Sequence, residues 1–361
     1  MYTYKQELET PLVCTSFPVP HNEMVFFDIE TTGFSPKNTI VYLIGCVYFE
    51  DKLPYIVQWT AENNAEEPLL IHAFFEFISR FKVIIHYNGE GFDIPYLVKK
   101  CQSYQMPYDF DQFKSIDLYK LVSPYKKQLK LTNLKQKTLE EFLDIKRKDD
   151  IGGGELIPVY LQYQKQPSKA LLSSLLLHNH DDLTGLLNIL PILSYHSLFH
   201  GNIKDCECQI HTYTDITGIQ EQEAFFTFHC LSSVPKRISY GKEEYYLTCF
   251  ENVGKLKVKV YTGELKFFFP NYKDYYYLPV EDVSIHKSVS FYVDKHFRTK
   301  AKAANCYSKK TGRFLPQLET VVTPYFKKDY HDKKTYFEAT DEFLQAPDSQ
   351  LEYVKHILSI L

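Results

Sequence analysis

Tryptophan and long hydrophobic runs are the features that this sequence of 361 residues has least of. It contains one Trp against 29 Tyr and 27 Phe. No stretch reaches the roughly 20 apolar residues that a membrane-spanning helix needs, and residues 1–9 are polar rather than the start of a signal peptide. We therefore expect a cytoplasmic protein without a membrane partner.

Paired cysteine motifs are also missing. The eight cysteines show no C-x-x-C spacing, which favours reduced thiols over a disulfide framework. His200, Cys206, Cys208 and His211 could in principle form a zinc site, but a C-x-C pair lacks the usual spacer between zinc ligands. We interpret this segment as linker and strand.

An excess of basic residues over the whole chain is absent, since the net charge is −4. This excludes a uniformly basic coat for nonspecific binding of nucleic acid. Locally, residues 118–138 contain six lysines and no acid, and residues 286–313 contain eight Lys or Arg and one acid, Asp294. A solvated protein face is the alternative interpretation of both segments.

The hydrophobic pattern predicts an α/β first half and a β-rich second half. The predicted strands are residues 24–30, 39–49, 54–60, 82–87 and 115–118, and the predicted helices are residues 65–81, 93–103, 131–142, 155–163 and 168–190. After His200 the period changes to two, with predicted strands at 245–250, 255–261 and 264–269, turns at 252–254 and 262–263, and a closing helix at 350–361. The predicted domains are an N-terminal extension (1–21), an α/β domain (22–200) and a mostly antiparallel domain (201–361).

Two acids mark the end of the first predicted strand. Asp28 and Glu30 stand at positions i and i+2, so their side chains share one face of the strand. Two like charges on one buried face are costly unless a cation neutralises them, which favours a metal site over packing. The alternative is a pair of solvent-exposed acids.

Two further motifs follow in order. Residues 86–93 (HYNGEGFD) place Asn88 in a predicted turn and Asp93 at the start of a helix, and residues 178–182 (HNHDD) lie inside a long predicted helix. His178 and Asp182 are spaced i, i+4 and therefore point the same way. Asp181, next to Asp182, is expected to be exposed and is the less favoured alternative ligand.

These motifs resemble those of the DEDD exonucleases of the ribonuclease H-like superfamily, whose first motif reads D-x-E-T-T-G. The chain is also similar to the YprB-like group of bacterial proteins, whose further signatures correspond here to Leu134, Glu140, Ile145, Arg147, Asp149, Asp150, Ile151 and Gly153. The resemblance covers residues 22–195. One departure concerns the histidine: the superfamily has either Tyr four residues or His five residues before the last acid, whereas His178 stands at the tyrosine spacing.

The resemblance implies a ribonuclease H-like mixed sheet flanked by helices and a divalent-metal-dependent nuclease, specifically a 3′–5′ exonuclease on single-stranded DNA or RNA. Asp28, Glu30, Asp93 and Asp182 would bind two Mg²⁺ or Mn²⁺ ions, and His178 would be the general base. Thr31, Thr32 and Asn88 would contact the substrate; Asn88 could instead orient Asp93 or form the turn. The alternatives are a nucleic-acid-binding scaffold without turnover and a phosphodiesterase of short oligonucleotides.

The second domain carries its own candidate site for single-stranded nucleic acid. The substrate-binding candidates there are Lys300, Lys302, Lys309 and Lys310, interleaved with the aromatic residues Phe291, Tyr292, Phe297, Tyr307 and Phe314. Cations bind phosphates and aromatic rings stack on unpaired bases, so together they predict a single-strand track. The alternatives are a sheet edge whose lysines block aggregation, or a module that binds a protein partner.

Overall fold

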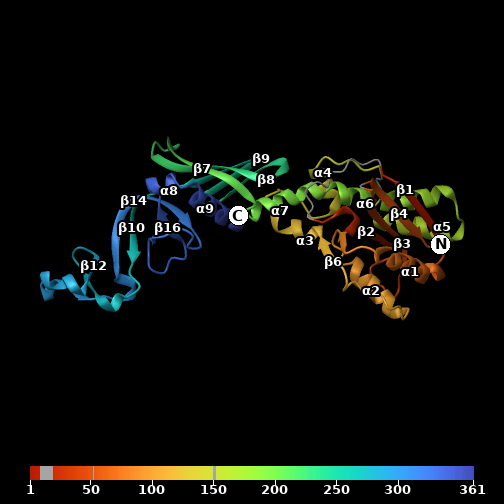
Figure 1. Ribbon diagram of the computed structural model, residues 1–361, viewed down its shortest axis with the longest axis horizontal. Coiled ribbons are helices and arrows are strands. Elements are labelled where there is room, and N and C mark those ends of the chain that lie inside the picture. Colours follow the sequence, from red (N-terminus) through yellow and green to blue (C-terminus); the bar gives the residue numbers. More distant parts are fainter. Residues whose placement is uncertain (9–18, 52, 149–151) are drawn as a thin grey trace. The chain divides into compact units, whose positions relative to one another are not determined.

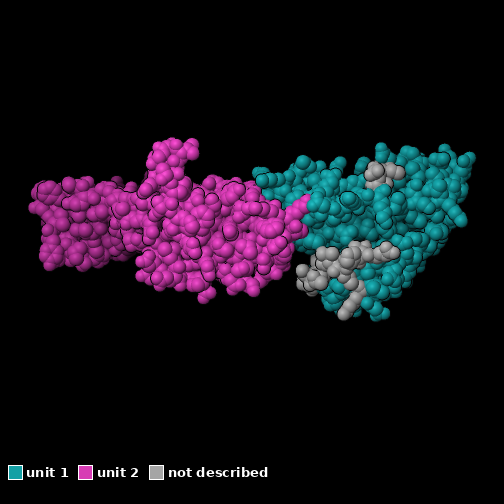
Figure 2. Space-filling view, turned by 90° about the horizontal axis from the view of Figure 1, so that it is seen from above, with its two compact units in different colours: residues 1–196 teal, residues 197–361 magenta. Residues whose placement is uncertain are grey.

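The computed structural model divides into two compact units, residues 1–196 and 197–361, which Figure 2 shows in different colours. The structure describes residues 1–8, 19–51, 53–148 and 152–361. The boundary between the units falls inside helix α7 (Leu193–Phe199), a few residues before the predicted boundary at residue 200.

Unit 1 is built on a six-stranded mixed sheet with the strand order β1-β4-β3-β2-β5-β6. Its strands are β1 (Tyr2–Glu7), β2 (Met24–Thr31), β3 (Val41–Glu50), β4 (Leu53–Thr60), β5 (Val83–His86) and β6 (Lys114–Asp117). Strand β2 pairs antiparallel with β3 and parallel with β5. The predicted mixed sheet is therefore confirmed.

Helices cover both faces of this sheet (Figure 1). They are α1 (Glu67–Ile78), α2 (Asp93–Ser103), α3 (Leu118–Val122), α4 (Gln136–Phe142), α5 (Gly153–Lys165) and α6 (Lys169–Asn188). Val25, Phe27 and Ile29 of β2 join the core formed with α1 and α2, while Tyr42 and Leu43 of β3 pack with α5 and α6. Because side chains alternate along β2, Asp28 and Glu30 lie on the face toward α6.

The N-terminal extension predicted for residues 1–21 begins with a strand of the sheet. Strand β1 pairs antiparallel with β4 along its whole length, from Tyr2 opposite Thr60 to Glu7 opposite Tyr55. Its side chains are mostly exposed, as at a sheet edge, so it lacks the apolar run that made the other strands recognisable. The predicted helix at 131–142 is also shorter, because α4 begins at Gln136.

Unit 2 contains three antiparallel sheets, as expected for a β-rich region. The first consists of β7 (Ile203–Thr214), β8 (Gln220–Lys242) and β9 (Tyr245–Lys259), with helix α9 (Pro347–Ile360) against β7. The second has the order β10-β14-β16-β15 and consists of β10 (Tyr261–Phe268), β14 (Tyr307–Gln317), β15 (Tyr325–Phe326) and β16 (Thr335–Glu338), followed by α8 (Asp341–Leu344). The third consists of β11 (Tyr275–Leu278), β12 (Val283–His286) and β13 (Thr299–Lys300).

Both predicted turns in this half are wrong. Residues 252–254 lie inside the long strand β9, and residues 262–263 lie inside β10. A Cβ at Gly254 would lie 2.1 Å from the Phe228 ring, so this glycine is required by close packing on the neighbouring strand rather than by a turn. Among the described residues, no helix is both long and apolar enough to cross a membrane.

Candidate metal centre

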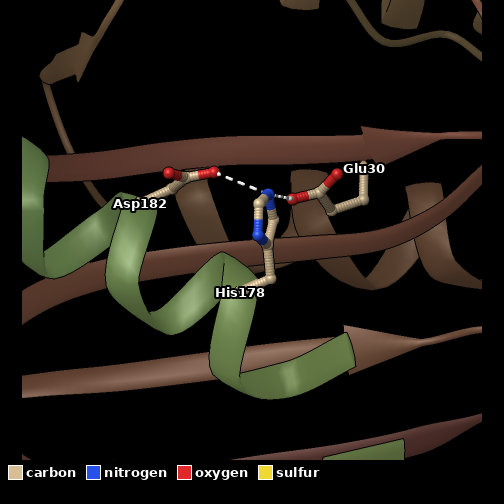
Figure 3. Close-up of side chains that lie close together, drawn as sticks. All are labelled: Glu30, His178 and Asp182. Carbon is tan, nitrogen blue, oxygen red and sulfur yellow. Dashed lines mark ion pairs between the residues drawn. The ribbon is translucent and has the colours of Figure 1, made fainter. Parts of the chain in front are cut away.

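Strand β2 and helix α6 bring together three of the predicted site residues. His178 Nε2 lies 3.6 Å from Glu30 Oε1 and 3.3 Å from Asp182 Oδ2. Figure 3 shows the imidazole between the two carboxylates. Each of the three side chains offers one ligand atom, and these atoms lie within 4.8 Å of one another. His178 and Asp182, which are spaced i, i+4, therefore point the same way, as predicted.

Asp28 is held from α6 by an amide that is not among the predicted site residues. Asn179 Nδ2 donates to Asp28 Oδ2 at 2.9 Å, and the Asn179 oxygen accepts from Gln58 Nε2 at 2.9 Å. Because Gln58 occupies the amide oxygen, the amide nitrogen must face the acid. A Cβ at Gly45 would lie 2.0 Å from this amide oxygen, so glycine in β3 allows α6 to approach the sheet. A glycine inside a buried strand was the available sequence signal for this approach.

Asp93 reaches the same region from the first turn of α2. The parallel pairing of β2 with β5 ends at Phe26 and Ile85, and beyond it the backbone N–H of Ile29 donates to Asp93 Oδ1 at 3.3 Å. The Asp93 carboxylate thus accepts the hydrogen bond from Ile29 at a position where β5 no longer pairs with β2.

The charges of these acids disfavour one another. Burial, followed by the negative charges of Asp182, Glu30 and Asp93, raises the pKa of Asp28 well above its usual range. Burial also raises the pKa of Asp93 to about 7, and Asp117 and Asp182 add to this effect. Carboxylates that repel one another in a shielded site are the donor set that a hard divalent cation requires. The residues present therefore fit Mg²⁺ or Mn²⁺.

The second oxygen of Asp182 is bound by an arginine. Arg147 Nη2 lies 2.5 Å from Asp182 Oδ1, and its Nη1 lies 3.0 and 3.1 Å from the two oxygens of Glu140. Glu140 is buried, and a Cβ at Gly185 would lie 2.0 Å from its Oε1. Gln136 Nε2 donates to both Glu140 Oε1 and the Asp182 carbonyl, at 2.9 and 2.7 Å. The signature residues Glu140 and Arg147 therefore restrain Asp182; the neighbouring signature residues 149–151 lie outside the described part of the chain.

Asp181 is buried, contrary to the expectation that it is exposed. Its Oδ2 accepts the backbone N–H of Lys148 at 2.6 Å, and its Oδ1 lies 3.3 Å from His180 Nδ1. It anchors the segment that carries Arg147.

The predicted substrate contacts near the cluster have local partners. Thr31 Oγ1 donates to the Gly33 carbonyl at 2.9 Å, and Thr32 Oγ1 accepts from the Ile40 N–H at 3.0 Å. Asn88 has a φ of 59°, a left-handed conformation that asparagine tolerates, so it forms the turn. Phe34, two residues after Thr32, is 91% exposed, and the centre of its ring lies 5.9 Å from that of Phe92.

A buried acid shapes the Asn88 turn and is not among the predicted site residues. Asp117 Oδ1 accepts the Asn88 N–H at 2.8 Å, and its Oδ2 accepts the Glu90 N–H at 3.3 Å. Nearby, His86 Nε2 lies 2.9 Å from Ser115 Oγ, but this is not a nucleophilic triad. His86 Nδ1 accepts the Gly89 N–H at 3.1 Å, so Nε2 carries the proton and cannot take one from the serine.

Within the described ranges, the lysines of the predicted track in unit 2 fall into two groups, those that lie in ion pairs and those that are exposed without one. Lys309 Nζ lies 2.6 Å from Asp282 Oδ2, and Lys310 Nζ lies 2.5 Å from Glu338 Oε2. Tyr307 and Phe314 are buried. Lys300 and Lys302, by contrast, are exposed, as are Phe291, Tyr292 and Phe297.

Comparison with known families agrees with the fold of unit 1. Residues 25–194 match the model of the RNase H superfamily, and this match spans β2 to α7 with every acid of the cluster. This part of the chain is therefore a ribonuclease H-like domain, and the predicted superfamily is confirmed.

The other comparisons add little. Among the solved structures that match is a family B DNA polymerase from the hyperthermophilic archaeon Pyrobaculum calidifontis, at 19% identity over 51% of this chain, with a TM-score of 0.41. The match spans 26% of the polymerase chain. A search of curated proteins found no match.

Proposed function

We propose that the ribonuclease H-like domain is a metal-dependent phosphodiesterase of the DEDD type that degrades single-stranded DNA or RNA from the 3′ end. The observation that supports this most strongly is the cluster of Glu30, His178 and Asp182, whose ligand atoms lie within 4.8 Å of one another. The negative charges of Asp182, Glu30 and Asp93 also disfavour the charged form of Asp28 beside them. Several carboxylates gathered in one shielded site are costly for folding unless a cation neutralises them.

In this proposal Asp28, Glu30, Asp93 and Asp182 hold two divalent cations, Mg²⁺ or Mn²⁺, whose chemistry is to activate water and to stabilise the charge that develops on the phosphate. His178 accepts the proton of the attacking water, a role that histidine side chains often have in general acid–base catalysis. Asn179 orients Asp28, and Arg147 restrains Asp182. The exposed ring of Phe34 is a stacking surface for the terminal base.

The substrate and polarity are tested by incubating purified protein with 5′- and 3′-end-labelled single strands and duplexes of DNA and RNA in Mn²⁺. We expect Mn²⁺-dependent product ladders that begin at the 3′ end of single strands. Ladders from the 5′ end, or internal cuts without ladders, contradict the exonuclease assignment. Hydrolysis limited to the shortest oligonucleotides identifies the phosphodiesterase alternative.

One observation favours a scaffold without turnover, our second candidate. The Arg147 guanidinium neutralises one oxygen of Asp182 and so competes with a cation for the fourth acid. Binding of nucleic acid without cleavage in either Mg²⁺ or Mn²⁺ would select this candidate. We further propose that residues 201–361 form a separate domain that binds nucleic acid or a protein partner.

A further inference from the structure

Residues 286–300 of unit 2 expose three large aromatic side chains on short, well-defined turns. The segment runs from the end of β12 through η6 (Lys287–Tyr292) and η7 (Lys295–Phe297) to β13, at the end of the unit where Figure 1 labels β12. Phe291, Tyr292 and Phe297 are 68%, 80% and 59% exposed. Adjacent exposed aromatic residues on a folded surface are typical of an interaction site.

Hydrogen bonds within the segment join parts of the backbone that carries these rings. Arg298 donates to the Ser290 carbonyl, and its guanidinium carbon lies 4.9 Å from the centre of the Tyr276 ring. Ser290 Oγ donates to the Lys287 carbonyl at 2.8 Å, and Asp294 accepts the His296 N–H at 2.9 Å. These bonds restrict the backbone of the segment, and a restricted surface binds a ligand at a lower entropic cost than a loose loop does.

The same segment carries an excess of positive charge. It contains four cations, namely Lys287, Lys295, Arg298 and Lys300, and one acid, Asp294. In the part of the chain that the structure describes, the three lysines lie in no ion pair, whereas Lys309 and Lys310 lie within 2.6 Å of acids. The lysines of this segment are therefore available to an anionic ligand.

A ligand for this surface must offer negative charges and flat apolar faces at close spacing. Single-stranded nucleic acid has both, because its phosphates alternate with unpaired bases. We propose that residues 286–300 bind single-stranded DNA or RNA, with bases stacked on Phe291, Tyr292 and Phe297 and with phosphates at Lys287, Lys295 and Lys300. The proposal rests on the proposed function in that the ribonuclease H-like domain would act on the same polymer.

The test measures binding of fluorescent single-stranded DNA and RNA by anisotropy at several salt concentrations. The full-length chain carries Asp28→Asn throughout, so that the ligand stays intact. One variant replaces the three exposed rings by Ala, and a second combines Lys287→Gln with Lys295→Gln. The matched control combines Lys309→Gln with Lys310→Gln, which removes the same charge from paired lysines.

The variant without the three rings should bind more weakly by about tenfold for each ring that is lost. Loss of Lys287 and Lys295 should reduce the slope of log affinity against log salt by about 1.4, because each phosphate contact contributes about 0.7. The control should leave the slope unchanged. Wild-type affinity and slope in both segment variants would overturn the proposal, as would binding by this segment only to vesicles containing an anionic phospholipid.

A second assay separates this proposal from the proposed function. Hydrolysis of a dinucleotide in Mn²⁺ is measured with Asp28 intact, and should be the same with and without the segment substitutions. If the dinucleotide is hydrolysed but the substitutions leave strand binding unchanged, only this inference fails. If no substrate is hydrolysed but the substitutions abolish strand binding, only the proposed function fails.

Discussion

Replacing Asp93 by Asn should stabilise unit 1 at neutral pH in the absence of metal. Burial raises the pKa of Asp93 from its usual 3.8 to about 7. The folded protein therefore keeps a proton that the unfolded chain releases, and wild-type stability falls as the pH rises from about 4 to about 7. A shift of about three units corresponds to a loss of about 4 kcal/mol by the upper end of this range. Asparagine keeps the oxygen that accepts the Ile29 N–H and removes the ionisation.

Urea unfolding in a chelator measures this effect, with the fluorescence of Trp59 as the signal. Trp59 is the single tryptophan, and it is buried in β4 of unit 1. Between about pH 5 and 8, the stability of wild type should fall more steeply than that of Asp93→Asn. Parallel pH profiles for wild type and Asp93→Asn would refute the reasoning.

Three further predictions concern the residues around the cluster. Arg147→Met should destabilise unit 1 by about 3–5 kcal/mol in the same unfolding assay, because it leaves the negative charge of buried Glu140 without a cation. Adding Glu140→Gln should restore most of this loss, and equal stability of the single and double variants would contradict this reasoning. Gly45→Ala places a Cβ 2.0 Å from an amide oxygen on α6 and should destabilise unit 1 by about 1–3 kcal/mol. Gly154→Ala, with no atom within 4 Å of its Cβ, should not destabilise it. Equal effects of the two substitutions would contradict the close approach of α6 to β3. His178→Ala should lower Mn²⁺-dependent turnover by about 10²–10⁴-fold with nearly unchanged Mn²⁺ affinity in calorimetry; a large loss of affinity, with turnover restored by excess Mn²⁺, would make His178 a ligand.

The part of the site that the sequence predicts is the part set by local periodicity. Asp28 and Glu30 share a strand face and His178 and Asp182 share a helix face, and these relations depend only on the geometry of one element. The contact of Asp93 with Ile29 follows from where the parallel pairing ends. The residue at which two strands stop pairing cannot be predicted from the sequence of one strand.

Long-range partners account for what was not predicted. The amide of Asn179 is oriented by Gln58, 121 residues away, and Arg147 reaches Asp182 across 35 residues. In unit 2, Lys309 and Lys310 looked like free cations because their acids come from other segments. Charge density along a chain therefore does not distinguish lysines that lie in ion pairs, such as Lys309 and Lys310, from lysines that lie in none.

The same limit explains the fold errors. Strand β1 has exposed, mixed residues and is recognisable only through its pairing with β4. Gly254 has the sequence signature of a turn but serves to accommodate the ring of Phe228.

We propose above all that Asp28 and its neighbouring acids bind the divalent cations that catalyse phosphodiester hydrolysis. It is tested most directly by degradation of an end-labelled single strand in Mn²⁺ by wild type and by Asp28→Asn, each checked for folding by its Trp59 fluorescence. We expect a product ladder for wild type that chelator abolishes, and no cleavage by the folded variant. Undiminished cleavage by Asp28→Asn, or by wild type in chelator, would contradict it.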